Sequence, residues 1–534
     1  MKLLLALVVL VLVVALFVRV TLFSSLPSRR ARWRIRFRLK PAPGFASFAE
    51  LAFRWSRLAA VVHGRRVRPD LGFWARLFCP VTWYAWRLGR AQYFKRVFAP
   101  QEHQTAIIAP PRVGKSGFLG EWMLSHRGAC VSFTTRADLY ELTAGTRAQL
   151  GPVYVFNPYG VGGIPSTFRP DIVAGCLSPE VAVRRAAALI GETTMMGEMV
   201  FWSDKAAVAL AGLMHAAAVG GHDMSKVYLW ANRSGESELA ALAKRPWAAR
   251  ELFAGLAEIY SDTKAASSIR MTLLRSLGWL AVPELRDMVC GPEVREVDAG
   301  EFAESRSTLY MILRDGSSSV AAPLFRLICD LMHHEGNLAA TRTRYRRHVP
   351  GVFFAVDEVA NIGLPKLAQK LADSAGFGSF MAIVIHSVAQ LREAYSPDAA
   401  GAILACCGTK VIMPGLADAD TLEDLSVLCG TVPIRRPGAE RRGALSVLRG
   451  TAAWGEGTAR VVMPEVIERL PANRALILHA NLSPLVVKFR TPWRRWSYRL
   501  GRLPLPPRPL PPAVPELILE WAGPELEGPS DAAA

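Results

Sequence analysis

The sequence lacks the cysteine patterns that indicate a disulfide framework or a metal centre. Its 534 residues include eight cysteines, none in a C-x-x-C pair and none accompanied by a histidine cluster. A disulfide-rich secreted domain and a zinc-binding domain are therefore excluded. We predict buried or free thiols in a reducing compartment. For the adjacent Cys406 and Cys407, packing in a core is favoured over redox chemistry.

Acidic side chains are nearly absent from residues 24–98. This stretch holds 17 Lys and Arg but only two acids, Glu50 and Asp70, and so accounts for +15 of the formal net charge of +19. Residues 1–23 add +2, which leaves only +2 for residues 99–534. Because most of the chain is nearly neutral, net charge alone is a weak indicator of nucleic-acid binding.

One apolar run is clearly long enough to cross a membrane. Leu3 to Val18 is unbroken, and Val20 to Phe23 extends the run past Arg19; about 20 residues span a bilayer. One basic residue precedes the run and a dense group of arginines follows it, so the positive-inside rule places the amino terminus outside. We predict a transmembrane helix at residues 1–23, in preference to a cleaved signal peptide. The protein would be single-pass in the cytoplasmic (inner or plasma) membrane, with the bulk of the chain in the cytoplasm.

Residues 24–98 are predicted to form a basic juxtamembrane segment. Within it, residues 32–40 (RWRIRFRLK) alternate basic and apolar side chains, which as a strand would place all the charge on one face. That face suits anionic lipid, with DNA as the alternative. Residues 72–88 are aromatic and apolar but contain Arg76 and Pro80. They predict an interfacial or re-entrant segment, with a second membrane span as the alternative.

Residues 105–116, TAIIAPPRVGKS, join an apolar strand to a phosphate-binding loop. The loop fits G-x-x-x-x-G-K-[ST] except at Ala109, which replaces the first glycine. If the loop needs a glycine-like backbone there, Ala109 adds strain of roughly 1 kcal/mol. Lys115 is predicted to reach the β- and γ-phosphates and Ser116 to bind Mg²⁺, while backbone amides face the phosphates. The predicted nucleotide-binding residues are Ala109, Pro110, Pro111, Arg112, Val113, Gly114, Lys115, Ser116 and Gly117.

A second apolar strand, Val352–Val356, ends in two carboxylates. Asp357 is predicted to hold Mg²⁺ together with Ser116. Glu358 is predicted to orient or deprotonate the attacking water, so that Glu358 and Lys115 are the catalytic candidates and ATP and Mg²⁺ the cofactors. Carboxylates that merely face water at a strand end are the simpler alternative.

Strand and helix patterns alternate along most of the chain, which predicts an α/β fold around a parallel sheet. The expected strands are 105–109, 128–134, 152–157, 307–313, 352–356, 380–385, 409–413 and 474–479. Between about 178 and 290 only helices are expected, at 179–190, 202–219, 236–243, 247–261 and 265–280.

This interruption predicts an all-α insertion at residues 179–299 within a nucleotide-binding domain formed by residues 99–178 and 300–495. Residues 496–534 are rich in proline. We predict a disordered tail there, with docking through P-x-x-P spacing as the alternative.

Several segments, in order, resemble the TraG/TraD-like coupling proteins of type IV secretion and conjugation. The resemblance covers roughly residues 100–495, and FFAVDEVANIG is its most specific block. The other blocks are APPRVGKS, VYVFNPYG, Phe201-Trp202, STLYMIL with APLFRLICDLM, HSVAQLREAY, GTKVIMPGLADADT and VVMPEVIERLPANRALIL.

The resemblance implies a RecA-like P-loop NTPase domain with an inserted all-α domain, anchored in the membrane and assembled as a homo-oligomeric ring, expected to be a hexamer. It implies ATP-driven delivery of DNA, expected to be single-stranded with an attached relaxase, to type IV secretion channel components. Two alternatives stay open. One is a nucleotide-binding receptor or scaffold with weak hydrolysis, and the other is a coupling protein for protein substrates only.

Two further positions depart from the family pattern. His386 stands where the family usually has a phosphate-sensing glutamine, while Gln390 matches its second glutamine. We assign His386 as a candidate sensor, against the alternative of a structural histidine at a strand end. Residues 373–379 contain no arginine, although members often place a neighbour-reaching arginine near there. The arginines considered as substitutes, in an expected loop, are Arg435, Arg436, Arg441 and Arg442.

Overall fold

The computed structural model covers most of the chain beyond its amino-terminal segment. Within the described residues, no helix combines the length and the apolar character that a bilayer crossing requires. The predicted transmembrane helix (1–23), the alternating segment 32–40 and the proline-rich tail (496–534) lie outside the described residues. The described ranges are 43–92, 95–191, 198–232, 235–261, 263–314, 319–437, 454–489 and 491–494.

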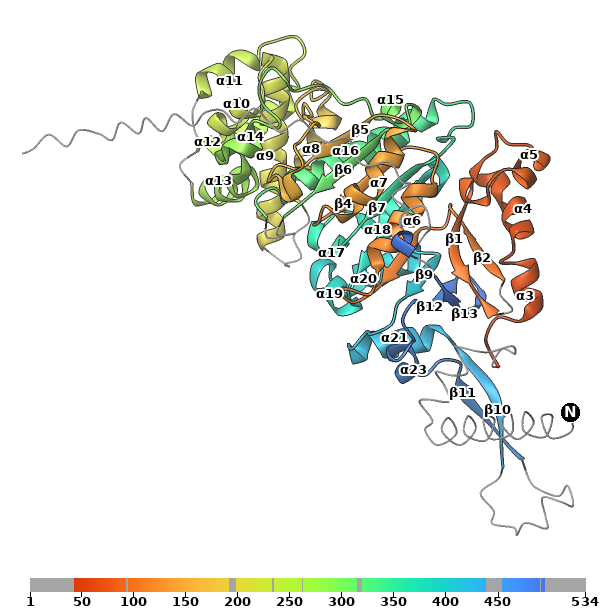
Figure 1. Cartoon of the computed structure of the whole chain (residues 1–534). Helices are drawn as coiled ribbons and strands as arrows, with labels where there is room; N and C mark the ends of the chain where they lie inside the picture. Colours follow the sequence, from red (N-terminus) through yellow and green to blue (C-terminus); the bar gives the residue numbers. More distant parts are fainter. Residues whose placement is uncertain are drawn as a thin grey trace, which may run out of the picture.

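An 11-stranded sheet runs through the molecule in the order β2-β1-β13-β12-β9-β3-β8-β7-β4-β6-β5 (Figure 1). Its larger part, from β9 to β5, is parallel, as predicted. These strands are short, apolar and buried on both faces, as parallel strands covered by helices must be. They are β3 (Thr105–Ile108), β4 (Cys130–Thr134), β5 (Val153–Phe156), β6 (Thr308–Ile312), β7 (Val352–Val356), β8 (Ser379–Ile385) and β9 (Thr409–Ile412).

The remaining strands extend the sheet in antiparallel fashion. They are β12 (Arg474–His479), β13 (Leu482–Lys488), β1 (Ala85–Arg90) and β2 (Arg96–Pro100). Of these strands, only β12 was expected from the sequence pattern. Because β1 and β2 belong to the sheet, the sheet begins before the boundary predicted at residue 98.

Residues 72–88 are neither the re-entrant segment nor the second membrane span that their composition suggested. They form α5 (Phe73–Phe78), the 3₁₀ turn η1 (Val81–Trp83) and the start of β1. The reason is protein packing: Trp86 is buried and stacks on Trp122, with ring centroids 5.1 Å apart. Three aromatic side chains of α5, Phe73, Trp74 and Phe78, are exposed, and an interfacial position for α5 stays a prediction.

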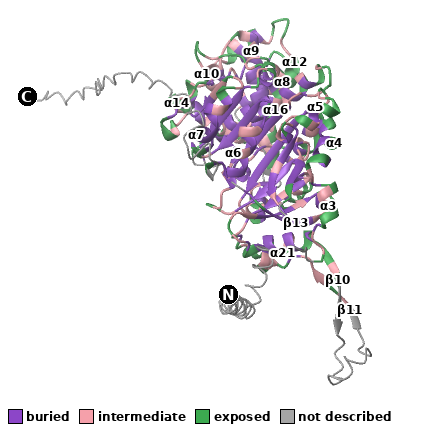
Figure 2. Ribbon diagram, turned by 45° about the vertical axis from the view of Figure 1, so that its right-hand side comes forward, coloured by how far each residue is buried: buried purple, intermediate pink, exposed green. Residues whose placement is uncertain are grey.

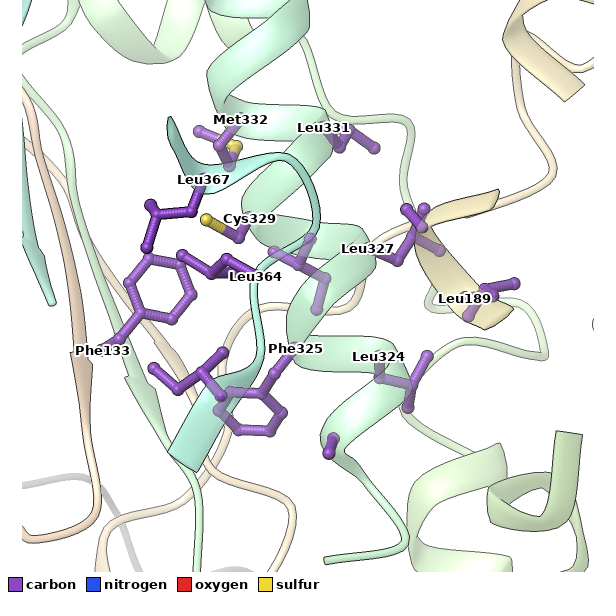
Figure 3. Close-up of a cluster of buried hydrophobic side chains, with 14 of the residues drawn as sticks. Phe133, Leu189, Leu324, Phe325, Leu327, Cys329, Leu331, Met332, Leu364 and Leu367 are labelled. Atoms are coloured by element: carbon purple, nitrogen blue, oxygen red, sulfur yellow. The ribbon is translucent and has the colours of Figure 1, made fainter. Parts of the chain in front are cut away.

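Helices cover both faces of the sheet, and alternate strand residues supply the two cores. In β7, Phe353 packs with α6 (Lys115–Ser125) and α7 (Asp138–Ala148), whereas Phe354 packs with α16 (Ala322–Thr341). Figure 3 shows the second core, in which Phe133 of β4 lies beside Leu364 and Leu367 on one side of α16, and Leu327 of α16 faces Leu189 on the other. The other helices are α3 (Phe48–Phe53), α4 (Arg57–Val67), α17 (Val359–Ile362), α18 (Leu367–Phe377), α19 (Val388–Tyr395), α20 (Pro397–Cys406), α21 (Ala419–Leu428) and α23 (Pro464–Glu468).

A helical block lies between β5 and β6 in the sequence, and most of its helices gather beyond the β5 end of the sheet, apart from α15 (Ala299–Glu304), which lies against α16 (Figure 1). Its helices follow the helix-only pattern expected for this region; the limits 179–299 assigned to a separate domain stay a prediction. Arg184 of α8 ties the block to α16, because its guanidinium lies 3.4 Å from Asp330 and 2.8 Å from Glu335. The block comprises α8 (Pro179–Ile190), α9 (Glu198–Gly220), α10 (Met224–Ala231), α11 (Glu236–Leu242), α12 (Arg250–Tyr260), α13 (Lys264–Leu277), α14 (Pro283–Arg286) and α15 (Ala299–Glu304).

A two-stranded antiparallel arm, β10 (Thr431–Pro437) and β11 (Trp454–Arg460), projects from the body (Figure 2). Arg435 and Arg436 therefore lie in a strand, not in the loop that we expected. Arg441 and Arg442 lie outside the described residues.

Candidate functional site

The candidate site lies at one edge of the sheet, where neighbouring parallel strands end. The loop after β3 leads into α6, Asp357 and Glu358 follow β7, and His386 follows β8. Because the carboxyl ends of parallel strands meet at one edge, side chains more than 240 positions apart in sequence come within hydrogen-bonding distance.

The backbone of the loop turns at positions other than the one we expected. Ala109 is fully buried, and its N–H donates to the carbonyl oxygen of Ile385 at 3.0 Å. Left-handed backbone occurs instead at Arg112 (φ 66°) and Gly114 (φ 95°). The strain predicted for Ala109 is thus absent, and the unfavourable conformation, which costs roughly 1–2 kcal/mol, falls on exposed Arg112.

Gly114 is the N-cap of α6 and forms no side-chain cap. The first amides of α6 are thereby left to bind another acceptor, and helix N-termini favour anions. Among the other predicted loop residues, Pro110 and Val113 are half-buried, Pro111 is exposed, and Gly117 is buried in the first turn of α6.

Lys115 is the centre of the site. Its ammonium group donates to Glu358 Oε1 at 2.8 Å and lies 3.6 Å from Asp357 Oδ1. It also lies 3.3 Å from His386 Nε2. The residue is only 9% exposed, so these carboxylates compensate a cation that would otherwise be costly to bury.

Glu358 is held by a second group of side chains that the sequence reasoning had not assigned. Its Oε2 accepts from Asn361 Nδ2 at 3.0 Å and from Thr135 Oγ1 at 3.4 Å. Asn361 in turn accepts from Gln390 Nε2 at 3.4 Å. Asn361 belongs to the FFAVDEVANIG block and could have been found there, whereas no pattern distinguished Thr135. The backbone of Glu358 is left-handed (φ 64°), and its side chain reaches Lys115 at the end of the loop.

Asp357 and Ser116 form the part of the site that fits a divalent cation. Ser116 Oγ donates to Asp357 Oδ2 at 3.2 Å, while Oδ1 is buried without a hydrogen-bond partner among the described residues. Burial raises the pKa of Asp357 and so disfavours its ionised form. A bound cation would oppose this effect, because a nearby positive charge favours the carboxylate. Mg²⁺ is commonly bound by one or two protein oxygens together with substrate phosphates, which this pair can provide.

His386 and Glu358 perturb each other's titration. The hydrogen bond from His386 is the main cause that lowers the pKa of Glu358 to about 2, and Lys115 adds to the effect. The same hydrogen bond raises the pKa of His386. His386 Nδ1 lies 3.2 Å from the Ala109 carbonyl oxygen, so Nδ1–H donates there. Neutral Nε2 can then accept from Lys115, while protonated Nε2–H donates to Glu358.

The structure thus brings together Lys115, Ser116, Asp357, Glu358 and His386, as expected, and puts Ala109 to Gly117 in the loop and first turn beside them. It places Arg435 and Arg436 on the projecting arm. A glycine-lysine loop between a parallel strand and a helix, facing paired carboxylates at a neighbouring strand end, defines an α/β protein of the P-loop class.

Residues 171–489, more than half of the chain, match the model of the type IV secretion-system coupling protein DNA-binding domain. The chain therefore belongs to the type IV secretion-system coupling protein family, which confirms the resemblance seen in its motifs.

Solved structures of the bacterial conjugative coupling protein TrwB share the fold. The unbound form of TrwBdeltaN70 is 19% identical, with a TM-score of 0.59 over 74% of this chain and 87% of that chain. TrwB in complex with ADP and Mg²⁺ is 19% identical, with a TM-score of 0.58 over the same shares. TrwB with a non-hydrolysable ATP analogue is 18% identical, with a TM-score of 0.56 over 75% of this chain and 89% of that chain. No curated protein matches the sequence.

Proposed function

We propose that this chain is a membrane-anchored ATPase that couples ATP hydrolysis to delivery of DNA or nucleoprotein to a type IV secretion channel. The observation that carries the proposal is the cluster of Lys115, Ser116, Asp357 and Glu358 at the end of the phosphate loop. The family assignment supports it. The structures of TrwB with ADP and Mg²⁺ and with an ATP analogue support the same cofactors for this chain.

Each side chain has a role that follows from its contacts. The amides of the loop and Lys115 bind the phosphates, and Ser116 and Asp357 hold Mg²⁺, which neutralises phosphate charge when bound. Glu358, ionised at neutral pH, orients the attacking water or accepts its proton. Because Lys115 is paired with Glu358 here, phosphates must compete for its ammonium group. Nucleotide binding would thereby release the carboxylate for catalysis.

The proposal includes a transmembrane anchor at residues 1–23 and a ring of identical subunits, a hexamer, through which DNA with its attached relaxase is moved. The apolar run before the first described residue supports the anchor. The name of the matching family model supports DNA as a partner; that the DNA is single-stranded and that the secretion channel receives it are parts of the proposal.

The proposal is tested by measuring ATP hydrolysis by the full-length protein in detergent, with and without single-stranded DNA. We expect DNA to stimulate turnover, and Lys115→Ala and Glu358→Gln each to reduce it by about a hundredfold or more. Lys244→Ala removes an exposed lysine of the helical block and serves as the matched control, with wild-type turnover expected. Unchanged turnover in both site variants would refute the assignment of the site.

A second candidate, transport of protein substrates without DNA, is favoured by one observation. The helical block exposes large apolar side chains, at Leu229, Trp247 and Met271, which suit a protein partner better than a phosphate backbone. Turnover that is abolished by both site variants but is indifferent to DNA would favour this candidate. Nucleotide binding without turnover would instead indicate a receptor or scaffold.

A further inference from the structure

The last described residues of the chain pack against the first turn of α6. Phe489, just after β13, contacts Phe118 with ring centroids 4.7 Å apart, and the turn η6 (Pro492–Arg494) follows. A Cβ atom added at Gly117 would lie 2.8 Å from Thr491 Cγ2 and 3.4 Å from Trp493 Cζ2. Phe489 and residues 491–494 therefore form a wall directly beside the phosphate loop.

This wall lies on the opposite side of α6 from the candidate catalytic groups. Lys115 and Ser116 point towards Glu358 and Asp357, which directly follow β7, and β7 lies beyond β8 on one side of β3. Phe489 continues β13, which lies beyond β9 on the other side of β3. With the γ-phosphate on the Glu358 side, the α-phosphate and the nucleoside leave the loop on the side of the wall.

The wall offers the two chemical groups that a nucleoside can use. Trp493 is 37% exposed, so part of its indole ring faces solvent beside the loop. Thr491 is 5% exposed, and its hydroxyl has no hydrogen-bond partner among the described residues. Because Gly117 has no side chain, Thr491 and Trp493 can lie close to the loop; a methyl group at position 117 would displace Thr491.

We propose that Trp493 is the stacking platform for the base of the nucleotide bound at the phosphate loop. The inference rests on the proposed function of this site and adds the residue that recognises the nucleoside. An indole ring stacks on any base through its π-face, without reading its hydrogen-bonding edge. This contact contributes affinity for nucleotides but none for an inorganic polyphosphate, which has no base.

The test compares equilibrium binding of ADP and of tripolyphosphate to the full-length protein in detergent with Mg²⁺. Trp493→Ala is expected to weaken ADP binding about tenfold and to leave tripolyphosphate binding unchanged. Trp493→Phe, which keeps an aromatic face, is expected to retain most of the ADP affinity. Trp247→Ala removes an exposed tryptophan of the helical block and is the matched control, with wild-type affinity for both ligands.

Equal ADP affinity in Trp493→Ala and Trp247→Ala would overturn the inference. Equal weakening of ADP and tripolyphosphate would also overturn it, because Trp493 would then only support the loop. Retained tripolyphosphate binding shows that the site is folded in the variant. If the wild-type protein binds neither ligand, the proposed function itself fails, and this outcome is distinct from failure of the stacking assignment.

Discussion

The hydrogen bond between His386 and Glu358 makes the stability of the candidate site depend on pH. The folded-state pKa of His386 lies above its ordinary value of 6.5, because protonated Nε2–H donates to Glu358. Its stabilising contribution is therefore complete below about pH 6.5 and is lost as the pH rises through the raised pKa. Glu358, with a pKa of about 2, stays ionised throughout this window.

We expect the thermal unfolding midpoint of the wild type to fall, relative to that of His386→Gln, as the pH rises from about 6 to about 8.5, since an amide does not titrate. Scanning calorimetry of the full-length protein in detergent measures this difference. His222→Gln removes a histidine that lies 3.3 Å from Glu238 outside the site and is the matched control. Parallel pH curves for the wild type and His386→Gln would show that the hydrogen bond contributes nothing.

The starts of β4 and β7 approach each other more closely than side chains allow. A Cβ atom at Gly128, just before β4, would lie 1.9 Å from the carbonyl oxygen of Gly351, just before β7. These strands are neighbours in the parallel sheet, so the overlap cannot be relieved by a side-chain rotation and must move backbone. Gly401 in α20 differs, because nothing lies within 4 Å of a Cβ atom there.

We therefore expect Gly128→Ala to lower the free energy of unfolding by about 2–3 kcal/mol. The matched substitution Gly401→Ala should raise it by about 0.5–1 kcal/mol, because alanine restricts the unfolded chain and favours helix. Denaturant unfolding of both variants measures the two effects. Effects of the same sign and size would mean that the approach of β4 and β7 is not as tight as the structure shows.

At the scale of the whole molecule, the first three described helices present to solvent a surface that carries several large apolar side chains. Phe53 of α3, Leu58 and Val62 of α4, and Trp74 and Phe78 of α5 are all more than 60% exposed. Figure 2 shows exposed stretches of ribbon on these three helices. This surface directly follows the basic residues 24–42 and the apolar run before them. Apolar side chains next to clustered arginines are typical of a surface that lies at the headgroups of anionic lipids.

We expect a photo-crosslinking amino acid in place of Phe78 to form adducts with lipid when the full-length protein is embedded in anionic nanodiscs. The same group in place of Trp247, which is 70% exposed in the helical block, should form none. Mass spectrometry of the crosslinked peptides measures both. Adducts of position 78 with a second copy of the chain, without lipid, would identify the surface as a contact between subunits instead.

Several features of the protein follow from the sequence by itself. The parallel strands are continuous apolar runs bounded by turn residues, and the phosphate loop and Asp357-Glu358 are local motifs, so neighbouring residues alone predict them. The helix-only stretch between β5 and β6 follows from periodicity in the same way. Such patterns depend on a few adjacent residues, so they can be recognised without knowing which residues these will pack against.

Other features were decided only by the tertiary structure. The sheet order makes Trp86 a core residue rather than a membrane-facing one, because β1 pairs with β13, almost 400 positions later. The left-handed backbone conformation that we expected at Ala109 occurs at Arg112 instead. The pairing of β4 with β7 places Thr135 beside Glu358. The chain that follows β13 passes α6 and places Trp493 beside Gly117. These contacts join distant segments through packing, and no local pattern in the chain encodes which segments will meet.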